Sequence, residues 1–594
     1  MKTFLITVAG VLVGLTLFAL AAPIVVIALI SAAARPAPTP DRAVLSLDLR
    51  GGLTDQAPTG AFAFLGGKGQ SVMAIEATLR HAESDDRIKG LFVRLPETGM
   101  APAAADELRL AFQKFRAHGK FITAHAQGLY AEGLVTSTYE LAAASGDLWL
   151  QPGSAFQVTG LSKEDMFFKR MFDRFGLNAD FQQRYEYKTA VNPFLYDNYT
   201  PAHRESELSW MGSVYDTAIN AAASDRGRPL ATIKSLIEAG PYSAEDAKTQ
   251  GLIDRVGQPH EAEQSALSRA GDGAKLVDFG DYAGLVRGPS GFGIQDGPKV
   301  AVISAEGAIM TGRDDSPSPL GGEQTIRSDQ VSKAFYDAIK DKDVKAIVFR
   351  VSSPGGSDTA SEQILASVRA AKAAGKPVVV SMGTYGASGG YWIASEANEI
   401  VAEPSTLTGS IGVFGGKFVI GPALAKWGVD VHSLNVGGPY AGASDAGAPM
   451  TPQQKAAFSA WMDRIYDGFV ARVALGRRLP EARVREIARG RVWTGAQAKT
   501  LGLVDQVGGF YDAVDRAKAL GGIVGEARLQ PFGAAGSAFE AIQRLFGGQA
   551  SVAPLAALGL DVRNDPELQA LLAAARDARL RAEGATVLAP LWIR

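Results

Sequence analysis

An internal repeat is the sequence feature that most restricts the fold, because two stretches occur twice in the same order. The run DRIKGLFVR at residues 86–94 reads like KDVKAIVFR at residues 342–350. Further along, AKTQGLIDRVG from Ala247 resembles AKTLGLVDQVG from Ala498. Both pairs are offset by about 250 residues, so the chain is predicted to be a tandem duplication of one domain.

The repeat divides the chain of 594 residues into four predicted parts. We expect the first copy over residues 43–283 and the second over residues 299–530, with a Gly- and Pro-rich linker between them. Residues 1–35 precede the first copy. Residues 531–594 follow the second copy as a C-terminal extension to which the sequence assigns no role.

Within each copy, short β-branched runs alternate with longer amphipathic stretches. In the second copy, an apolar run at residues 347–351 precedes a helical pattern over residues 360–374, and another apolar run follows at residues 378–382. Near-continuous apolar strands separated by helices are typical of a mostly parallel sheet covered by helices. The predicted fold class is therefore α/β.

The N-terminus carries a long apolar run. No charged residue interrupts residues 4–33, and about 20 apolar residues suffice to span a bilayer core. We expect residues 1–35 to form an N-terminal transmembrane helix. A cleaved secretory signal is the alternative, since Ala19-Leu20-Ala21 offers an A-x-A-like site. The flanking charges do not fix the orientation.

The composition excludes several functional classes. Sixty Lys and Arg residues against 62 Asp and Glu residues give a net charge of -2, so no basic excess predicts a nucleic-acid partner. The chain has no cysteine, which excludes disulfides, thiol nucleophiles and Cys-ligated zinc. Its six histidines lack the HExxH spacing of a zinc hydrolase, and GSIGVFGGK departs from the P-loop pattern. No metal or nucleotide cofactor is expected.

A serine at a strand-to-helix turn is the first candidate for chemistry. The pentapeptide GASGG around Ser388 directly follows an apolar strand, so free N–H groups at the start of the next helix would favour negative charge near the hydroxyl. A second turn, at Gly355 and Gly356, can direct backbone N–H groups toward an oxyanion. The structural alternatives are a capping serine and a plain strand-ending turn.

A serine nucleophile needs a base, and lysine fits this sequence better than histidine. Only His432 follows Ser388, in a strand-like run that leaves little room for an intervening acid. Lys188 stands in YEYKTAVNPF, where burial among aromatic and apolar residues would lower the pKa of its amine. Glu186 must then be held away from that amine. A surface lysine is the alternative.

Three motifs together resemble the signal peptide peptidase A (SppA) family, in its long, two-copy bacterial form. They are YKTAVNPF around Lys188, YGASGGYWIA around Ser388 and PSTLTGSIGVFG around Ser410. The resemblance implies two ClpP/crotonase-like domains. It implies Ser388 as the nucleophile, Lys188 as the general base, Ser410 as the residue that orients the lysine, and Gly355, Gly356 and Gly389 as oxyanion-forming turns. Asn192 departs from the pattern, since an acidic residue before Pro-Phe is more usual.

The resemblance also implies a function. We expect a single-pass, membrane-bound serine endopeptidase with a Ser-Lys dyad, anchored in the bacterial cytoplasmic membrane with its catalytic domain in the periplasm. Its expected substrates are cleaved signal peptides and other unfolded hydrophobic peptides, and its expected assembly is a homo-oligomer, namely a homotetramer. The alternatives are a crotonase-type acyl-CoA hydrolase and a non-catalytic membrane scaffold of the same fold.

The repeat itself adds one expectation about the site. Aligning the two copies places Thr136 opposite Ser388 and Pro439 opposite Lys188. Each copy thus keeps one partner of the dyad and lacks the other. A functional pair would have to join the two copies across their interface.

Overall fold

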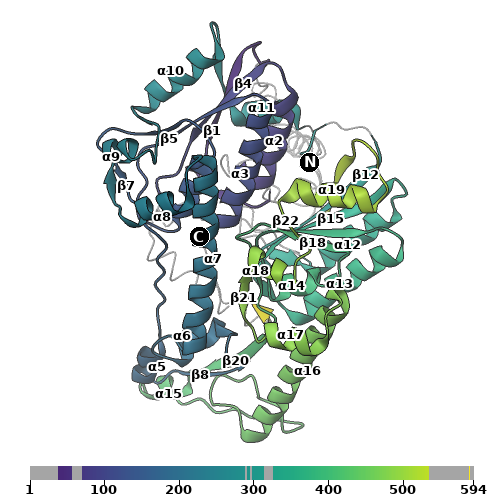
Figure 1. Ribbon diagram of the computed structural model, residues 1–594. Helices are drawn as coiled ribbons and strands as arrows, with labels where there is room; N and C mark the ends of the chain where they lie inside the picture. The colour runs from purple at the N-terminus through teal and green to yellow at the C-terminus, as the bar shows by residue number, and fades with distance from the viewer. Residues whose placement is uncertain are drawn as a thin grey trace, which may run out of the picture.

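The computed structural model describes residues 38–56, 70–287, 291–293, 297–313, 325–533 and 587–588. The predicted transmembrane helix at residues 1–35 lies outside these ranges. Within them, no helix is both long and apolar enough to span a membrane. The described chain forms two α/β halves, one at the upper left and one at the right of Figure 1.

The first half is built on a six-stranded sheet with the strand order β10-β6-β5-β4-β1-β11. Every neighbouring pair in this sheet is parallel. Parallel strands need cover on both faces, which explains why these runs are almost continuously apolar. The strands are β1 (Ala43–Asp48), β4 (Ile88–Arg94), β5 (Phe121–Ala126), β6 (Leu148–Leu150), β10 (Arg255–Val256) and β11 (Lys275–Asp278).

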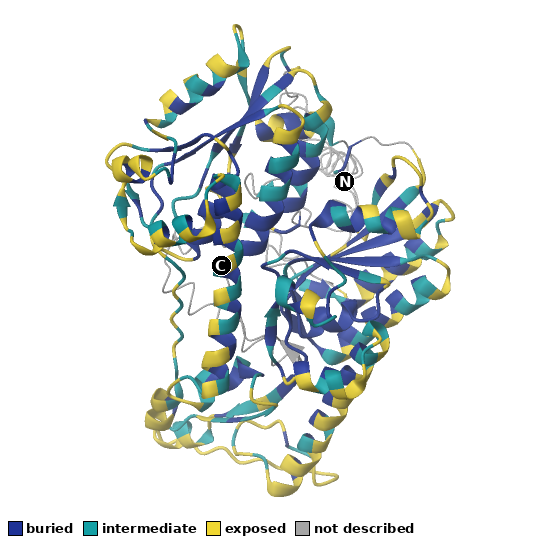
Figure 2. Ribbon diagram, viewed as in Figure 1, coloured by how far each residue is buried: buried dark blue, intermediate teal, exposed yellow. Residues whose placement is uncertain are grey.

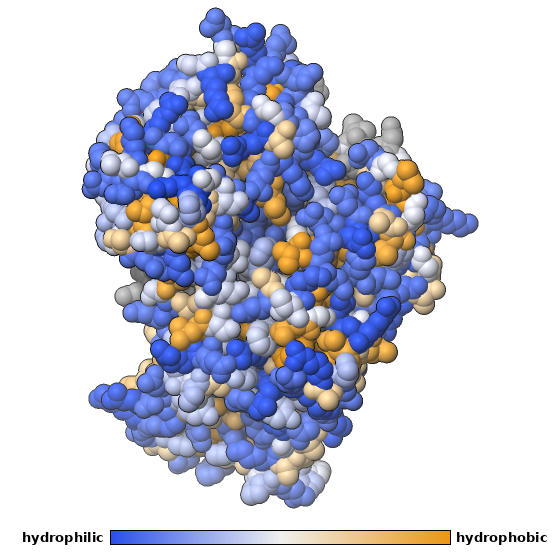
Figure 3. All heavy atoms as spheres, viewed as in Figure 1, coloured by the Kyte–Doolittle hydropathy of each residue, from blue (hydrophilic) through white to orange (hydrophobic). Residues whose placement is uncertain are grey.

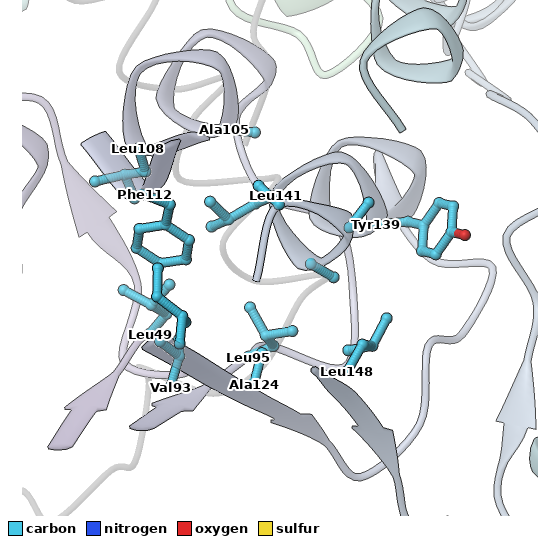
Figure 4. Close-up of a cluster of buried hydrophobic side chains, with 14 of the residues drawn as sticks. Leu49, Val93, Leu95, Ala105, Leu108, Phe112, Ala124, Tyr139, Leu141 and Leu148 are labelled. Carbon is cyan, nitrogen blue, oxygen red and sulfur yellow. The ribbon is translucent and has the colours of Figure 1, made fainter. Parts of the chain in front are cut away.

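Each face of the first sheet has its own apolar core, because successive strand residues point to opposite faces. One core, which contains Phe112 and Tyr139 (Figure 4), joins the sheet to several helices, among them α2 (Val72–Ser84), α3 (Pro102–Ala117) and α4 (Val135–Ala143). The other core, which contains Trp149 and Ala262, joins the opposite face to α10 (Pro259–Ala270).

The second half repeats this plan with an eight-stranded sheet. Its main order is β21-β19-β17-β15-β12-β23, and β18 pairs with β17 and with β22. All pairs are parallel except β19 with β21. The strands are β12 (Lys299–Glu306), β15 (Val344–Ser353), β17 (Val378–Ala387), β18 (Glu399–Ala402), β19 (Leu407–Gly409), β21 (Val492–Thr494), β22 (Gln506–Val507) and β23 (Arg528–Phe532).

Helices cover both faces of the second sheet as well. Helices α12 (Ser328–Lys340) and α13 (Asp358–Ala373) pack on one face, and α19 (Phe510–Leu520) packs on the other. Figure 2 shows both sheets as buried strands between helices with exposed outer faces. The predicted strand at residues 347–351 lies within β15, and the helix predicted over residues 360–374 corresponds to α13.

The two halves share a specific contact as well as a general plan. The Tyr139 hydroxyl donates a hydrogen bond to the Leu252 carbonyl at 2.9 Å. The Tyr391 hydroxyl makes the equivalent bond to the Leu503 carbonyl at 2.8 Å. Both acceptors belong to the repeated AKTxGL motif. The predicted tandem α/β duplication is therefore confirmed.

Two segments of the first half reach into the second. The long helix α7 (Pro201–Asp225) runs down from the first half beside β21 (Figure 1). The strand β8 (Asn178–Arg184) pairs antiparallel with β20 (Val413–Val419) of the second half. Because β8 pairs with a strand of the second half, the residues that follow β8 also lie in the second half.

A buried charge also joins the halves. Arg350 on β15 is 0 % exposed, and it bonds the carboxylates of Asp55 and Glu107 from the first half. Its remaining partner is the Ser381 hydroxyl at 2.8 Å.

On the face of the molecule shown in Figure 3, polar residues dominate the surface, and apolar residues are scattered over it.

Candidate active site

The structure brings Lys188, Ser388 and Ser410 together in one buried cluster. The Lys188 Nζ atom lies 2.7 Å from the Ser388 Oγ atom. It also donates to the Ser410 hydroxyl and to the Ser410 carbonyl, each at 2.9 Å. All three residues are 0 % exposed. Residues some 200 positions apart in the sequence therefore share one hydrogen-bonded site within a single chain.

A strained turn presents the Ser388 hydroxyl. Ser388 lies between β17 and the short helix α14 (Gly389–Ala394), with φ 56° and ψ -118°. Positive φ is uncommon for residues with a side chain and is held in place by surrounding structure. Here the Ser388 N–H donates to the Gly409 carbonyl at 2.8 Å. The serine therefore holds a fixed turn instead of capping the helix, because its side chain makes no cap bond.

The glycines that follow Ser388 are required by close packing. A Cβ atom on Gly389 would lie 3.0 Å from the Gly356 nitrogen and 3.1 Å from the Gly355 Cα atom. A Cβ atom on Gly390 would lie 2.5 Å from the Ser353 carbonyl oxygen. The serine turn is thus pressed directly against the second glycine turn, which forms β16 (Gly355–Gly356).

The β8 and β20 pair carries Lys188 into the second half. The lysine follows β8 and precedes the short helix η2 (Thr189–Val191). Gly490, with φ 83°, packs so closely that a Cβ atom there would lie 2.5 Å from the Lys188 nitrogen. Sequence reasoning missed Gly490, because nothing in its local sequence connects it to a lysine some 300 residues earlier.

Burial sets the electrostatics of the site. Removal from water lowers the pKa of the Lys188 amine well below its ordinary value of 10.5. No carboxylate among the described residues bonds this amine: Glu186 instead pairs with Arg489 at 2.8 Å on the surface. The Tyr187 hydroxyl likewise points to Glu205, at 2.8 Å. Both polar neighbours of Lys188 in the sequence are therefore paired elsewhere, and the buried amine keeps only the partners of the second half.

Ser410 fixes the direction of the amine. It also has a positive φ, of 48°, and its N–H donates to the Arg491 carbonyl at 2.8 Å. An uncharged amine has two N–H donors and one lone pair. With the donors directed at the hydroxyl and carbonyl of Ser410, the lone pair is left for the Ser388 hydroxyl.

The two predicted oxyanion turns meet, but their N–H groups differ. The Gly355 N–H donates to the Ser353 hydroxyl at 3.1 Å. Gly356 cannot carry a side chain, because a Cβ atom there would lie 2.0 Å from the Ile309 carbonyl oxygen. The Gly355 N–H is therefore already bonded within its own turn, whereas Gly389 begins helix α14, where backbone N–H groups have no partner within the helix.

Other candidate residues lie apart from this cluster. His432 is exposed, and no contact within the described chain joins it to Ser388. Asn192 is buried, and its amide has no hydrogen-bond partner among the described residues. In the first half, the Thr136 hydroxyl donates to the Gly160 carbonyl at 2.9 Å. Within the described ranges, no group of His, Asp and Glu residues has the geometry of a metal site.

The site combines a buried serine hydroxyl with a lysine amine that has no carboxylate partner in the described chain. This is the arrangement of a serine hydrolase with lysine as its base. The chain belongs to peptidase family S49, whose profile matches residues 114–271 and again residues 370–523, once in each half. It is a serine protease.

Two relatives with similar sequences agree with this assignment. "Protease 4" of Salmonella typhi is 34% identical over 464 residues, which cover 76% of this chain and 72% of the relative. "Serine protease SPPA, chloroplastic" of Arabidopsis thaliana is 29% identical over 483 residues, covering 80% and 68%. Among solved structures, a mutant of the 1510-N membrane-bound stomatin-specific protease in complex with a substrate peptide matches 42% of this chain and 97% of its own, with 15% identity and a TM-score of 0.26.

Proposed function

We propose that this serine protease cleaves peptide bonds with Ser388 as its nucleophile and Lys188 as its general base. The observation that carries the proposal is the 2.7 Å separation of Lys188 Nζ and Ser388 Oγ, in a site where no described carboxylate pairs with the amine. An amine kept uncharged by burial can accept the hydroxyl proton.

The proposed reaction has two stages. The Lys188 lone pair accepts the Ser388 proton while Oγ attacks the scissile carbonyl carbon, and the N–H groups of Gly356 and Gly389 bind the oxyanion. The lysine then gives its proton to the leaving amine, and an acyl-serine ester remains. Lys188 next deprotonates a water molecule, which attacks the ester and releases the acid product and the free serine.

Ser410 acts in this proposal as a positioning residue. Its hydroxyl and carbonyl each lie 2.9 Å from the amine. By receiving two N–H donors, they leave the lone pair in the direction of Ser388. The proton can therefore move in both stages without a reorientation of the lysine side chain.

The substrates we propose are cleaved signal peptides and other unfolded, apolar peptides. A fully buried dyad is out of reach of a folded protein, so the substrate we propose is an extended chain. The apolar run at residues 4–33 would act as a single-pass anchor in the cytoplasmic membrane, where such peptides remain after cleavage. We further propose that the catalytic halves face the periplasm and assemble as a homotetramer.

The same proposal gives the domain boundaries. Residues 43–283 form the copy that supplies the lysine, and residues 299–530 form the copy that supplies the serine. Residues 1–35 are the anchor, and residues 531–594 are an extension. The dyad straddles the two copies, so neither copy alone would be active.

The test measures cleavage of a fluorogenic apolar peptide by Ser388→Ala and Lys188→Met. Each variant should lose at least about 10³-fold in kcat, as loss of a nucleophile or its base does in serine proteases. The controls are Ser367→Ala, at a buried serine on α13, and Lys234→Met, at a lysine whose side chain is 44% exposed. Both controls should keep their rate. More than a tenth of wild-type turnover in a well-folded Ser388→Ala or Lys188→Met variant would reject the dyad.

A further inference from the structure

One arginine of the second half contacts the segments that carry both Lys188 and Ser410. Arg491 lies directly before β21, in the loop that follows α17 (Glu481–Ile487). Its carbonyl accepts the Ser410 N–H at 2.8 Å, and its guanidinium group pairs with a residue of the first half. Arg491 therefore links the serine that directs the amine to the half that supplies the amine.

The guanidinium group of Arg491 reaches the segment beside Lys188. It pairs with Glu205 of α7 at 2.7 Å, and its central carbon lies 5.0 Å from the centre of the Tyr187 ring. The Tyr187 hydroxyl donates to the same Glu205 carboxylate at 2.8 Å. The three side chains thus contact one another in a closed set, and Tyr187 is the residue directly before the lysine.

A second ring holds Arg491 from its own half. The guanidinium carbon lies 4.4 Å from the centre of the Trp493 ring, and the Trp493 indole N–H donates to the Ile487 carbonyl at 2.9 Å. Trp493 pairs with Thr408 of β19, the strand that ends directly before Ser410. A planar guanidinium group is stabilised by each aromatic ring that it lies over. The second half therefore fixes the side chain that contacts the first half.

Arg489, two residues earlier, also bridges the halves, but more weakly. It pairs with Glu186 at 2.8 Å, and its side chain is 47% exposed, whereas the side chain of Arg491 is 19% exposed. An exposed ion pair contributes little, because water and salt screen it. Arg491, with two rings and one carboxylate around a half-buried cation, is therefore the stronger link to the lysine segment.

We propose that Arg491 is a positioning residue for the general base. Its guanidinium group holds Tyr187 and thereby the backbone that carries Lys188, while its carbonyl fixes Ser410, which receives the N–H donors of the amine. This inference rests on the proposed function, because it takes Lys188 to be the base. Without the guanidinium group, the lysine segment can move away from Ser410, and water can reach the amine.

The test replaces Arg491 by methionine in the full chain. Arg491→Met keeps the carbonyl that fixes Ser410 and removes only the side-chain contacts. Displacement of a reacting group by about 1 Å costs on the order of 10²-fold in rate. Since the packing of Gly490 against Lys188 remains, kcat should fall by about ten-fold, with KM unchanged. Arg491→Lys keeps the charge but not the planar group, and should recover only part of the rate.

The matched control is Arg255→Met. Arg255 has the same kinds of contact, because it pairs with Asp147 at 3.2 Å and lies 5.1 Å from the centre of the Trp149 ring. It belongs to β10 in the first half and has no printed contact with the proposed dyad. This variant should keep the wild-type kcat. Equal kcat values in Arg491→Met and Arg255→Met would overturn the inference.

Tyr187→Leu removes the same ring contact from the side of the first half. It keeps the inference testable if Arg491→Met does not fold, and it should lower kcat with KM unchanged. In the double variant with Arg491→Met, the loss should be no larger than in Arg491→Met alone, because both substitutions act through one contact. Losses that multiply would contradict the proposed link.

The pH profile separates positioning from a purely structural role. An amine that water reaches regains a pKa nearer its ordinary value of 10.5. The apparent pKa in the profile of kcat/KM should therefore be higher in Arg491→Met than in wild type. A variant that only lowers the folded fraction loses rate without moving the profile. A lower kcat with an unmoved profile would therefore overturn the inference.

Chemical labelling of Lys188 gives a readout that does not need catalysis. Lys188 is 0 % exposed, so a water-soluble acylating reagent should modify it slowly, as followed by mass spectrometry in a chain that carries Ser388→Ala. Adding Arg491→Met should raise this rate by about ten-fold, since two ring contacts and an ion pair change an opening equilibrium by about that factor. Adding Arg255→Met should leave it unchanged. Equal labelling rates would contradict the proposed link.

These outcomes separate the inference from the proposed mechanism. If Ser388→Ala and Lys188→Met kept their turnover while Arg491→Met raised the labelling rate, the dyad would be wrong and the placement of Lys188 by Arg491 would stand. If both dyad variants were inactive while Arg491→Met changed neither kcat nor labelling, the dyad would stand and the role of Arg491 would be wrong.

Discussion

Replacement of Arg350 by methionine should lower the free energy of unfolding, because Arg350 links the two halves of the molecule. All five guanidinium N–H groups are used: Nε and Nη2 bind Asp55, Nη1 and Nη2 bind Glu107, and Nη1 also binds the Ser381 hydroxyl. Both carboxylates come from the first half, and Arg350 comes from the second. Methionine has a similar length but donates no hydrogen bond, so Arg350→Met leaves two buried carboxylates without their cation.

The magnitude follows from burial. Arg350 is 0 % exposed, and Asp55 and Glu107 are 7% and 1% exposed. Removing one partner of a buried ion pair costs about 3–5 kcal/mol, chiefly because the other charge stays buried and unpaired. We therefore expect Arg350→Met to lower the free energy of unfolding by at least about 3 kcal/mol. Activity should fall with it, because the dyad needs both halves in register.

The assay is urea denaturation at pH 7, followed by tryptophan fluorescence and by activity. The matched control is Arg516→Met, because Arg516 pairs with Glu399 at 2.5 Å but its side chain is 42% exposed. An exposed pair contributes at most about 1 kcal/mol. We also expect Arg350→Met to unfold in two transitions, one for each half, because the link between the halves is lost. Equal losses in the two variants would refute the reasoning.

Two further predictions concern the site and the half interface. Gly490→Ala should lower kcat by on the order of 10²-fold, because its Cβ atom would displace the Lys188 backbone. The control Gly522→Ala, at a glycine with φ 66° and open space around it, should keep full activity. Equal kcat values in the two variants would contradict this packing. Burial raises the pKa of Glu306 to about 7 from 4.5, so the folded state holds a proton that the unfolded state releases. The free energy of unfolding should therefore fall by about 3 kcal/mol as the pH rises between those two values. Denaturation at pH 5 and pH 8 should show a smaller fall in Glu306→Gln than in wild type, and an identical fall in both would contradict it.

Much of the fold could be predicted from the sequence, because its determinants are local or repeated. The strand within β15 and the helix α13 follow from hydrophobic periodicity over adjacent residues. The duplication follows from the repeated AKTxGL motif, whose backbone accepts the equivalent tyrosine bonds in both halves. The turn at Ser388 can also be predicted, because a Gly-rich pentapeptide directly follows an apolar strand.

The remaining features depend on contacts between distant residues, for which a single sequence has no local signal. Nothing near β8 indicates that it pairs with β20 of the other copy, and this pairing is what carries Lys188 to Ser388. The sequence suggested that the neighbouring tyrosines bury the lysine. In the structure Gly490 packs against it, while Tyr187 bonds a surface carboxylate.

The buried charges could not be predicted either. In the sequence, Arg350 is one charged residue at the repeat, matched by Arg94 in the first copy. Arg350 is fully buried among carboxylates, whereas Arg94 donates to the Gln127 side chain at 2.8 Å. Equivalent positions of the two copies differ because the second copy's arginine faces the half interface.

The dependence of kcat/KM on pH tests most directly whether Lys188 acts as an uncharged base. The profile of kcat/KM reports the pKa of the essential base in the free enzyme. Burial lowers the pKa of Lys188, so activity should be lost as pH falls through that lowered value and should be level well below pH 10. If kcat/KM instead kept rising with an apparent pKa near 10.5, the ordinary value for lysine, the amine would be an ordinary charged lysine, and the proposed dyad would be contradicted.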